Sequence, residues 1–144
     1  MIFQHTINQV LECRKTQTRR IIKAKEVAIR GKYNQIVEVV QNGRTKWRIG
    51  QTYAVQDGRG KPQIARIRIN KINSEHITRI SSKDAVAEGF ADRHEFLATW
   101  KTIHGDKAMD LRVWIITFEV VSYTAPAIKH SPSLRYVPRP ITAQ

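Results

Sequence analysis

Hydrophobic and polar residues alternate most clearly over residues 65–70, and this alternation predicts a strand. Ala65, Ile67 and Ile69 fall on one face, and the residues between them, two of which are arginines, fall on the other. Residues 111–121 are apolar on both faces through their middle, which predicts a long strand at the centre of a sheet. Shorter strands are predicted over residues 1–3, 36–40 and 53–55, and Asn42-Gly43 is typical of a turn.

Apolar residues at helical spacing predict three helices. The first covers about residues 5–13. Ser81 and Asp92 each precede an acidic residue by three positions, which is typical of a helix start, and Gly89 and Gly105 follow as helix ends. The last helix has an apolar face that we expect to be buried: Phe96, Leu97, Trp100 and Ile103.

The order of these elements favours a mainly β fold with α-helices, of the α+β class. Strands dominate and do not alternate with helices as βαβ units, which argues against a parallel, doubly wound sheet. A small curved sheet or partly open barrel with helices at its side fits better. We expect one domain over residues 1–123. Four of the five prolines lie in the last 21 residues, so residues 124–144 are interpreted as a Pro-rich basic tail.

The charge of the chain changes the picture, because the formal net charge is +13 at pH 7. Residues 1–50 contain 11 Lys and Arg against 3 Asp and Glu, a net charge of +8, so the surplus is concentrated in the N-terminal third. A domain this basic usually meets a polyanion, because cations laid against phosphates release condensed counterions. The predicted partner is a nucleic acid, with RNA favoured over DNA.

Other features of the sequence exclude several classes of protein. Val113–Phe118 is a six-residue apolar run between charged residues, far short of the roughly 20 residues of a membrane-spanning helix. Cys13 is the only cysteine, so an intrachain disulfide and a thiolate metal cluster are excluded, and we expect it to be a small buried residue. The five histidines show no metal-ligand spacing. A cytoplasmic monomer without metal or cofactor is therefore expected.

The densest candidate site is the segment Arg14-Lys15-Thr16-Gln17-Thr18-Arg19-Arg20, which follows the first predicted helix. Arg14, Lys15, Arg19 and Arg20 place four cations within seven residues, and two threonines stand among them. Guanidinium groups match phosphate oxygens and threonine hydroxyls add neutral contacts, so we favour a phosphate clamp over a solvated basic loop.

A second group of basic residues lies near two aromatic residues. Glycines in Gly58-Arg59-Gly60-Lys61-Pro62 would let the backbone approach a ligand between Arg59 and Lys61. Arg66 and Arg68 could extend the basic surface, although an ordinary solvent-facing side of the strand is as good an interpretation. Trp47 stands between two cations, so partial exposure is expected. Trp47 and Tyr53 are candidates for stacking a base, with core packing as the competing interpretation. For Trp100, Trp114 and Phe118 we expect core packing.

These segments, in this order, resemble the ASCH domain of the PUA-like superfamily over roughly residues 1–122, with residues 21–46 as a variable insertion. The residues that carry the resemblance are Arg14-Lys15-Thr16-Gln17-Thr18-Arg19, Trp47-x-x-Gly50-x-x-Tyr53-x-Val55, Gly58-Arg59-Gly60-Lys61-Pro62, Asp84-Ala85-x-x-Glu88-Gly89-Phe90, Phe96-x-x-x-Trp100 and Val113-Trp114-x-x-x-Phe118-Glu119.

The resemblance implies a PUA-like β-pseudobarrel flanked by helices, with a cleft between them and RNA or nucleotide recognition as a general theme. Some small bacterial relatives are amidohydrolases that deacylate acetylcytidine with a lysine, a threonine and a glutamate. The matching positions here are Lys15, Thr18 and Glu88. Another relative is a ribonuclease, so the resemblance does not fix one reaction.

Three hypotheses follow, and the placement of a few side chains distinguishes them. The first, which the charge favours, is an RNA-binding module that holds phosphates in a basic cleft. The second is an enzyme, either an amidohydrolase of an acylated nucleoside or a ribonuclease. The third is a regulatory module whose cations serve solubility and a protein partner. If the protein is an enzyme, we expect Lys15, Thr18 and Glu88 to converge within hydrogen-bonding reach in a concave pocket. If it only binds, we expect Lys15 and the arginines to spread over an open basic surface.

Overall fold

The computed structural model describes residues 1–124, so residues 125–144 of the predicted tail lie outside the described part of the chain. Residues 1–124 form one antiparallel sheet with the strand order β1-β7-β6-β3-β2, and β4 and β5 pair with β3 and β6. The strands are β1 (Gln17–Ile21), β2 (Glu26–Arg30), β3 (Ile36–Gln41), β4 (Arg44–Arg48), β5 (Thr52–Gln56), β6 (Gln63–His76) and β7 (Arg112–Tyr123). The helices are α1 (Ile7–Leu11), α2 (Ser82–Ala87) and α3 (Arg93–His104), with short 3₁₀ helices η1 (Ile77–Arg79) and η2 (Asp106–Asp110).

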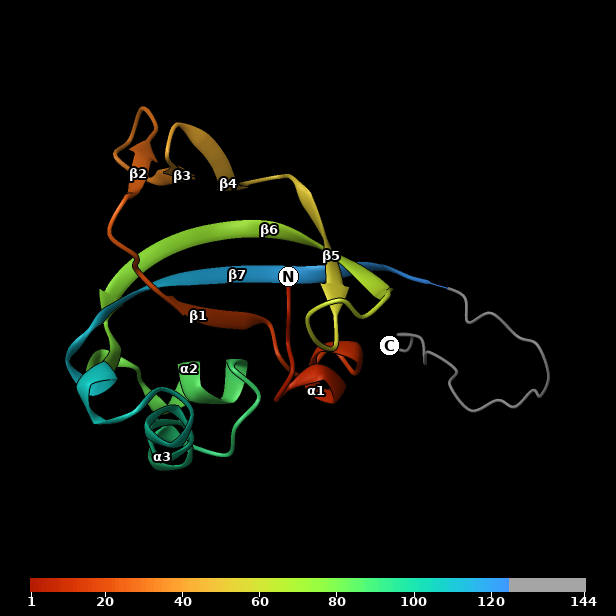
Figure 1. Ribbon diagram of the computed structural model, residues 1–144, viewed down its shortest axis with the longest axis vertical. Helices are drawn as coiled ribbons and strands as arrows, with labels where there is room; N and C mark the ends of the chain where they lie inside the picture. The colour runs from red at the N-terminus through yellow and green to blue at the C-terminus, as the bar shows by residue number, and fades with distance from the viewer. Residues whose placement is uncertain (125–144) are drawn as a thin grey trace.

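Two long strands form the centre of the sheet. β6 and β7 are 14 and 12 residues long and arch over the helices (Figure 1). Their register shifts between Arg66 and Ile67 and again between Ile69 and Lys71. Such irregularities bend a strand and increase its twist, which accounts for the arch. The predicted α+β class and the central position of β7, between β1 and β6, are confirmed. The sheet curves without closing into a barrel.

A hairpin of β3 and β4 extends the sheet above the long strands. Asn42 and Gly43 connect the two strands with positive φ angles of 53° and 77°, which only glycine and asparagine adopt readily. The predicted turn is therefore confirmed. β2 and β4 were not expected from the sequence. Both are mostly exposed, so neither shows a hydrophobic alternation that would reveal it.

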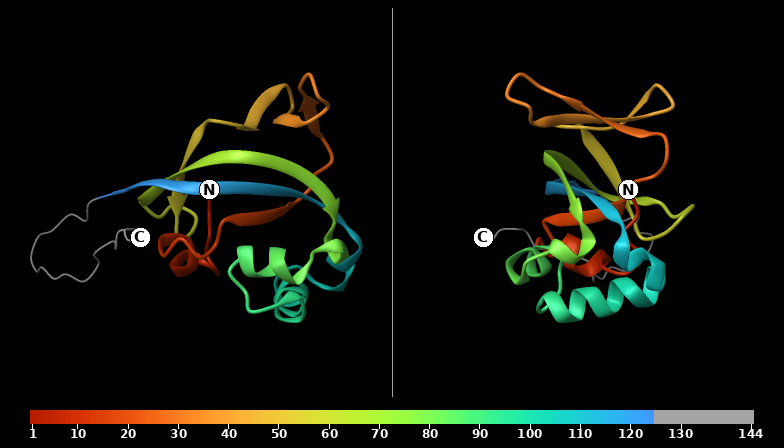
Figure 2. Two further views of the ribbon diagram at one scale, coloured as in Figure 1. Left: turned by 180° about the vertical axis from the view of Figure 1, so that it is seen from behind. Right: turned by 90° about the vertical axis from the view of Figure 1, so that its left-hand side faces the viewer.

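The three α-helices lie on the opposite side of the long strands from this hairpin (Figures 1 and 2). The Ser81 side chain accepts a hydrogen bond from Asp84 N, and the Asp92 side chain accepts one from Glu95 N. Both predicted helix starts are confirmed. Within residues 1–124, no helix combines the length and the apolar character needed to cross a membrane.

The core consists of three apolar clusters around the arch. One lies between the helices and the sheet and includes Phe96, Trp100 and Ile115. A second joins the β3–β4 hairpin to β6 and β7 and includes Trp47 and Trp114. The third packs the N-terminal segment and α1 against β5, β6 and β7. The core positions predicted for Trp100, Trp114 and Phe118 are confirmed, with exposed fractions of 5%, 4% and 2%.

Several local expectations for the backbone near the N-terminus are wrong. Residues 1–3 do not form a strand, and only Ile2 bridges to Gln56. The first helix covers Ile7–Leu11 alone, because its N-cap Thr6 makes no side-chain cap and Cys13 turns the chain with a φ of 61°. The segment expected as a loop over residues 14–20 is in its second half the strand β1, because β7 supplies a partner from about 95 residues further along the chain.

Three side chains differ in exposure from what the sequence predicted. Trp47 was expected to be partly exposed but is buried among the β3, β6 and β7 side chains. Ile103 was expected in the core but is 41% exposed, because it falls near the end of α3. Cys13 was expected to be buried but is exposed in the turn after α1.

We predict that the centre of the arch carries much of the stability. Ile69 is fully buried in β6, whereas Ile29 in β2 is 42% exposed. Replacing Ile69 by Ala should lower the free energy of unfolding by about 2–5 kcal/mol, because apolar burial is lost and a cavity remains. Ile29→Ala, the same chemical change at an exposed position, should cost no more than about 0.5–1 kcal/mol. Urea unfolding measures both values, and equal losses would contradict the prediction.

Candidate functional site

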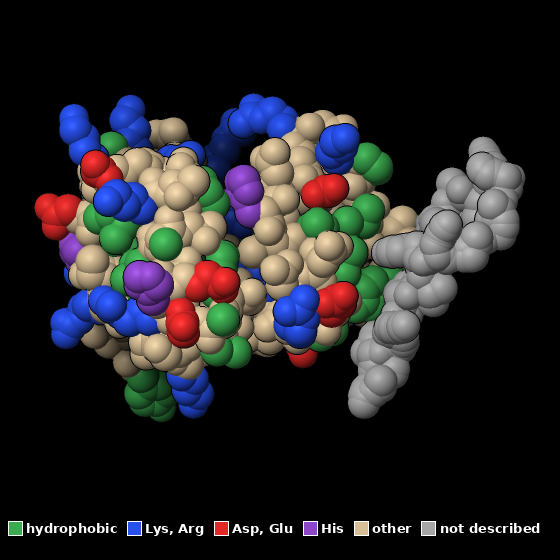
Figure 3. All heavy atoms as spheres, turned by 90° about the horizontal axis from the view of Figure 1, so that it is seen from below, with side chains coloured by type: hydrophobic (Ala, Val, Ile, Leu, Met, Phe, Trp, Pro, Cys, Tyr) green, Lys and Arg blue, Asp and Glu red, His purple; other side chains and the backbone are tan. Residues whose placement is uncertain are grey.

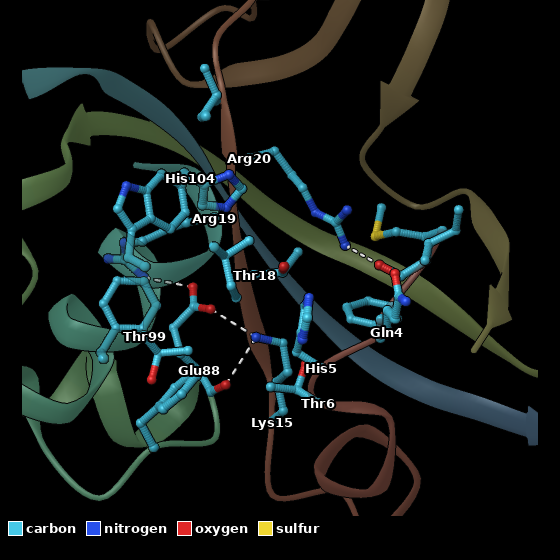
Figure 4. A pocket seen from close by; sticks show the side chains of 18 of the residues that line it. Gln4, His5, Thr6, Lys15, Thr18, Arg19, Arg20, Glu88, Thr99 and His104 are labelled. Carbon is cyan, nitrogen blue, oxygen red and sulfur yellow. Dashed lines mark hydrogen bonds and ion pairs between the residues drawn. The ribbon is translucent and has the colours of Figure 1, made fainter. Parts of the chain in front are cut away.

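A cavity of about 750 Å³ lies where the N-terminal segment, β1, β4 and α3 meet (Figure 4). Thr18 and Arg20 point to one face of β1 and Arg19 points to the other, because alternate residues of a strand point to opposite faces. All three residues line the cavity. Within residues 1–124, β1 pairs with β7 alone and is an edge strand. The cavity therefore runs along the free edge of β1. Its volume is within the range typical of small-molecule sites.

A buried ion pair lies in the wall of this cavity. Lys15 Nζ donates hydrogen bonds to Glu88 Oε1 at 2.8 Å and to the Glu88 carbonyl oxygen at 2.9 Å. The two residues are 4% and 2% exposed. Lys15 comes from the segment between α1 and β1, and Glu88 is the C-cap of α2. Gly89 has a φ of 97°, which lets the chain leave the helix directly beside Lys15.

Arg19 holds the other side of the same carboxylate. Its Nη1 donates to Glu88 Oε2 at 2.9 Å, and its Nη2 donates to Glu75 Oε2 at 2.8 Å and to Asp84 Oδ2 at 3.3 Å. Gln17 accepts a further hydrogen bond from Nη1, and the Arg19 side chain is fully buried. The guanidinium is thus occupied by three carboxylates, so it does not offer its terminal nitrogens to a phosphate.

Burial sets the protonation of Lys15. Removal from water disfavours the ammonium and lowers the pKa of Lys15 below its ordinary value of 10.5. Glu88 opposes this shift, while Arg20 and Arg19 add to the lowering. Arg19 pairs with the same carboxylate, so the negative charge of Glu88 stabilises two cations and not the Lys15 ammonium alone. A lysine held in this way is suited to act as a base in its neutral form.

Thr18 stands three residues after Lys15, on β1 opposite Ile116 of β7. It is 4% exposed and lines the cavity with Lys15 and Glu88 (Figure 4). Among the residues that the structure describes, its hydroxyl forms no hydrogen bond. Lys15, Thr18 and Glu88 thus line one cavity, but only Lys15 and Glu88 are within hydrogen-bonding distance of each other.

Aromatic rings and further basic side chains complete the cavity. The apolar part is formed by Phe3, Phe90, Phe96 and Trp100. Around these rings the cavity is lined by His5, Lys23, Lys46, Trp47 and His104. Lys46 is paired with Glu26 and lies over the Trp47 ring at 4.6 Å. No pattern in the sequence indicated that His5, Lys46 and His104 line a cavity, because they come from three distant segments of the chain.

The remaining predicted binding residues lie away from the cavity. Arg14 is exposed and pairs with Glu12 at 2.7 Å. Arg59 and Lys61 are exposed between β5 and β6. Arg66 bonds to Thr52, and Arg68 approaches Glu119 at 3.6 Å.

Tyr53 also lies outside the cavity, and its hydroxyl accepts a hydrogen bond from Arg48 N. The face seen from below is hollowed by a recess with a histidine at its edge and basic side chains at its upper end, and basic and acidic side chains are interspersed over the surface on both sides of it (Figure 3). The cations therefore do not form one continuous clamp on that face.

Comparisons with known proteins give the fold. No protein-family model matches the sequence, and no curated protein matches it. The structure is similar to that of a DUF984 protein from Enterococcus faecalis V583, with a TM-score of 0.59 and 19% identity over 81% of this chain and 66% of that one. It is also similar to an ASCH domain from Lactobacillus crispatus JV V101, with a TM-score of 0.54 and 20% identity over 81% of this chain and 70% of that one. The chain thus has an ASCH-like fold and spans about two thirds of these proteins.

We predict that Glu88 matters more to stability than Lys15 does. Glu88→Gln keeps the shape of the side chain but leaves two buried cations without its charge. The expected loss in free energy of unfolding is about 3–5 kcal/mol, because an uncompensated buried charge is costly. Lys15→Met leaves Glu88 paired with Arg19 and should cost clearly less. Denaturant unfolding of both variants provides the comparison, and the prediction is wrong if Lys15→Met is the more damaging.

Proposed function

We propose that the cavity is the active site of a small amidohydrolase that removes an acyl group from an acylated nucleoside such as acetylcytidine. The observation that carries the proposal is the 2.8 Å contact between Lys15 Nζ and Glu88 Oε1, buried in a cavity that Thr18 also lines. The resemblance to ASCH amidohydrolases assigns the same three positions. The cavity volume of about 750 Å³ has room for a nucleoside, and its aromatic rings offer apolar surface to a base.

The chemistry begins with Thr18 as the nucleophile. Neutral Lys15 accepts the proton of the Thr18 hydroxyl as Oγ1 attacks the acyl carbon. The amide C–N bond then breaks, and the proton held by Lys15 passes to the leaving nitrogen, directly or through Glu88. Water that gives its proton to Lys15 cleaves the resulting acyl ester, which releases the carboxylic acid and restores Thr18. Throughout, Glu88 keeps Lys15 Nζ in place.

This mechanism predicts that turnover depends on Lys15 and Thr18 while the fold does not. Thr18→Val and Lys15→Met should each lower kcat/KM for acetylcytidine by at least about 100-fold, because each removes a group that moves a proton or attacks. Thr16→Val is the matched control, since Thr16 is exposed on the same segment. The rate is measured by using chromatography to monitor the release of cytidine.

The pH profile tests the role of Lys15 separately. Since the base acts when neutral and burial lowers its pKa below 10.5, kcat/KM should rise with pH and level off above the Lys15 pKa. A profile that falls as pH rises, or unchanged turnover in Thr18→Val and Lys15→Met, would contradict the mechanism.

A second candidate function is binding of a nucleic acid, with RNA favoured. It is supported by the net charge of +13 and by the exposed side chains of Arg59 and Lys61 between β5 and β6. Within residues 1–124, neither of these side chains forms an ion pair. Arg66 and Arg68 lie on the adjoining strand β6. This surface is separate from the cavity, so binding and hydrolysis are compatible.

If this surface binds single-stranded RNA, affinity should fall steeply with salt, with a log–log slope of about −0.7 for each phosphate neutralised. The double change Arg59→Gln with Lys61→Gln should make the slope less steep by about 0.7–1.4. Arg79→Gln with Lys83→Gln removes the same charge from exposed positions near the helices and should leave the slope nearly unchanged. Fluorescence anisotropy over a salt series measures the slopes, and a flat wild-type response would exclude this function.

A further inference from the structure

The two adjacent arginines of β1 differ in how their charges are balanced. Arg19 is neutralised by Glu75, Asp84 and Glu88. Arg20 forms no ion pair with any carboxylate in the described part of the chain. Its Nη2 donates to the Ile2 carbonyl oxygen at 2.8 Å, and its guanidinium lies 5.2 Å from the centre of the Phe3 ring.

Arg20 also has hydrogen-bonding capacity that the protein does not use. The Nε of both arginines is buried without a partner, but in the described part of the chain only Arg19 is paired directly with carboxylates. Burial lowers the pKa of the Arg20 guanidinium and the charge of Glu88 opposes this shift, so the group remains protonated, as arginine does in proteins. A half-buried cation that no carboxylate pairs with directly is only partly compensated, so the site favours an anion supplied from outside.

The surroundings of Arg20 favour the same ligand. His5 and His104 line the cavity with Arg20 and offer ring nitrogens (Figure 4). Burial lowers the pKa of His104, and Arg20 and His5 lower it further, which reflects their proximity. Glu88 is the carboxylate that an entering anion would meet, and its charge is already neutralised by Lys15 and Arg19.

We propose that Arg20, with His5 and His104, forms a phosphate subsite, so that the cavity accepts a nucleotide in preference to a neutral nucleoside. The phosphate would take the free donors of Arg20 in charge-assisted hydrogen bonds. The base and acyl group would then extend toward Lys15 and Thr18. The identity of the rest of the ligand depends on the proposed function, whereas the anion subsite does not.

Calorimetric titration of the full chain with inorganic phosphate, cytidine and cytidine 5′-monophosphate tests the subsite. We expect the monophosphate to bind about 10- to 100-fold more tightly than cytidine, in line with hydrogen bonds to a charged group. Arg20→Gln should abolish this preference. Arg79→Gln, at an exposed position outside the cavity, should retain the preference.

The dinucleotide cytidylyl-(3′,5′)-cytidine separates a free nucleotide from a nucleic-acid strand, because its phosphate is a diester. Tighter binding of the monophosphate than of the dinucleotide supports a free nucleotide as the source, and the reverse order overturns that assignment.

Equal wild-type affinities for cytidine and its monophosphate, or an unchanged preference in Arg20→Gln, would overturn the subsite. If Arg20→Gln does not fold, His104→Gln replaces it, and its preference must also fall. The outcome is independent of hydrolysis. Phosphate-dependent binding without deacylation of acetylcytidine retains the subsite and contradicts the proposed function. Deacylation of acetylcytidine without any preference for the monophosphate supports the proposed function and overturns the subsite.

Discussion

One carboxylate, that of Glu88, holds the site together. Its two oxygens accept hydrogen bonds from Lys15 and Arg19, so a residue at the end of α2 fixes two cations on either side of the start of β1. The backbone supports the same junction, since Thr16 N donates to the Ala87 carbonyl oxygen at 2.7 Å. All three side chains are almost fully buried, so each charge depends on an opposite charge beside it, and Glu88 supplies that charge to both cations. The positions of Thr18 and Arg20 along β1 follow from this anchoring.

The second condition for the site is that the sheet stays open. β1 pairs with β7 on one side, and the cavity lies along its other edge. In a closed barrel another strand would occupy this space. Here the N-terminal segment, the Lys46–Trp47 part of β4 and the aromatic face of α3 surround it instead. Edge strands usually need such a covering, and in this chain the covering encloses a cavity of small-molecule size.

The surplus of basic residues serves several purposes that a charge count cannot separate. Arg19 organises carboxylates and Lys15 is a buried partner of Glu88, whereas Arg20 is half-buried and forms no ion pair in the described part of the chain. Arg59 and Lys61 lie on the exterior. The proposed hydrolase and the proposed phosphate subsite use the first group, and nucleic-acid binding would use the second. The predicted single clamp is therefore better described as an interior site and a separate exterior surface.

The sequence by itself determined the features that depend on neighbouring residues. It indicated the central strand β7, the Asn42-Gly43 turn and the caps of α2 and α3, because periodicity, turn geometry and capping act over a few positions. The ASCH resemblance also indicated Lys15, Thr18 and Glu88 as one set. Only the tertiary structure decided that Gln17–Ile21 forms a strand, that Trp47 is buried and that Arg19 faces carboxylates while Arg20 does not. These outcomes depend on partners as much as 100 residues away, and nothing in the local sequence reports the burial or the counter-charge that such partners provide.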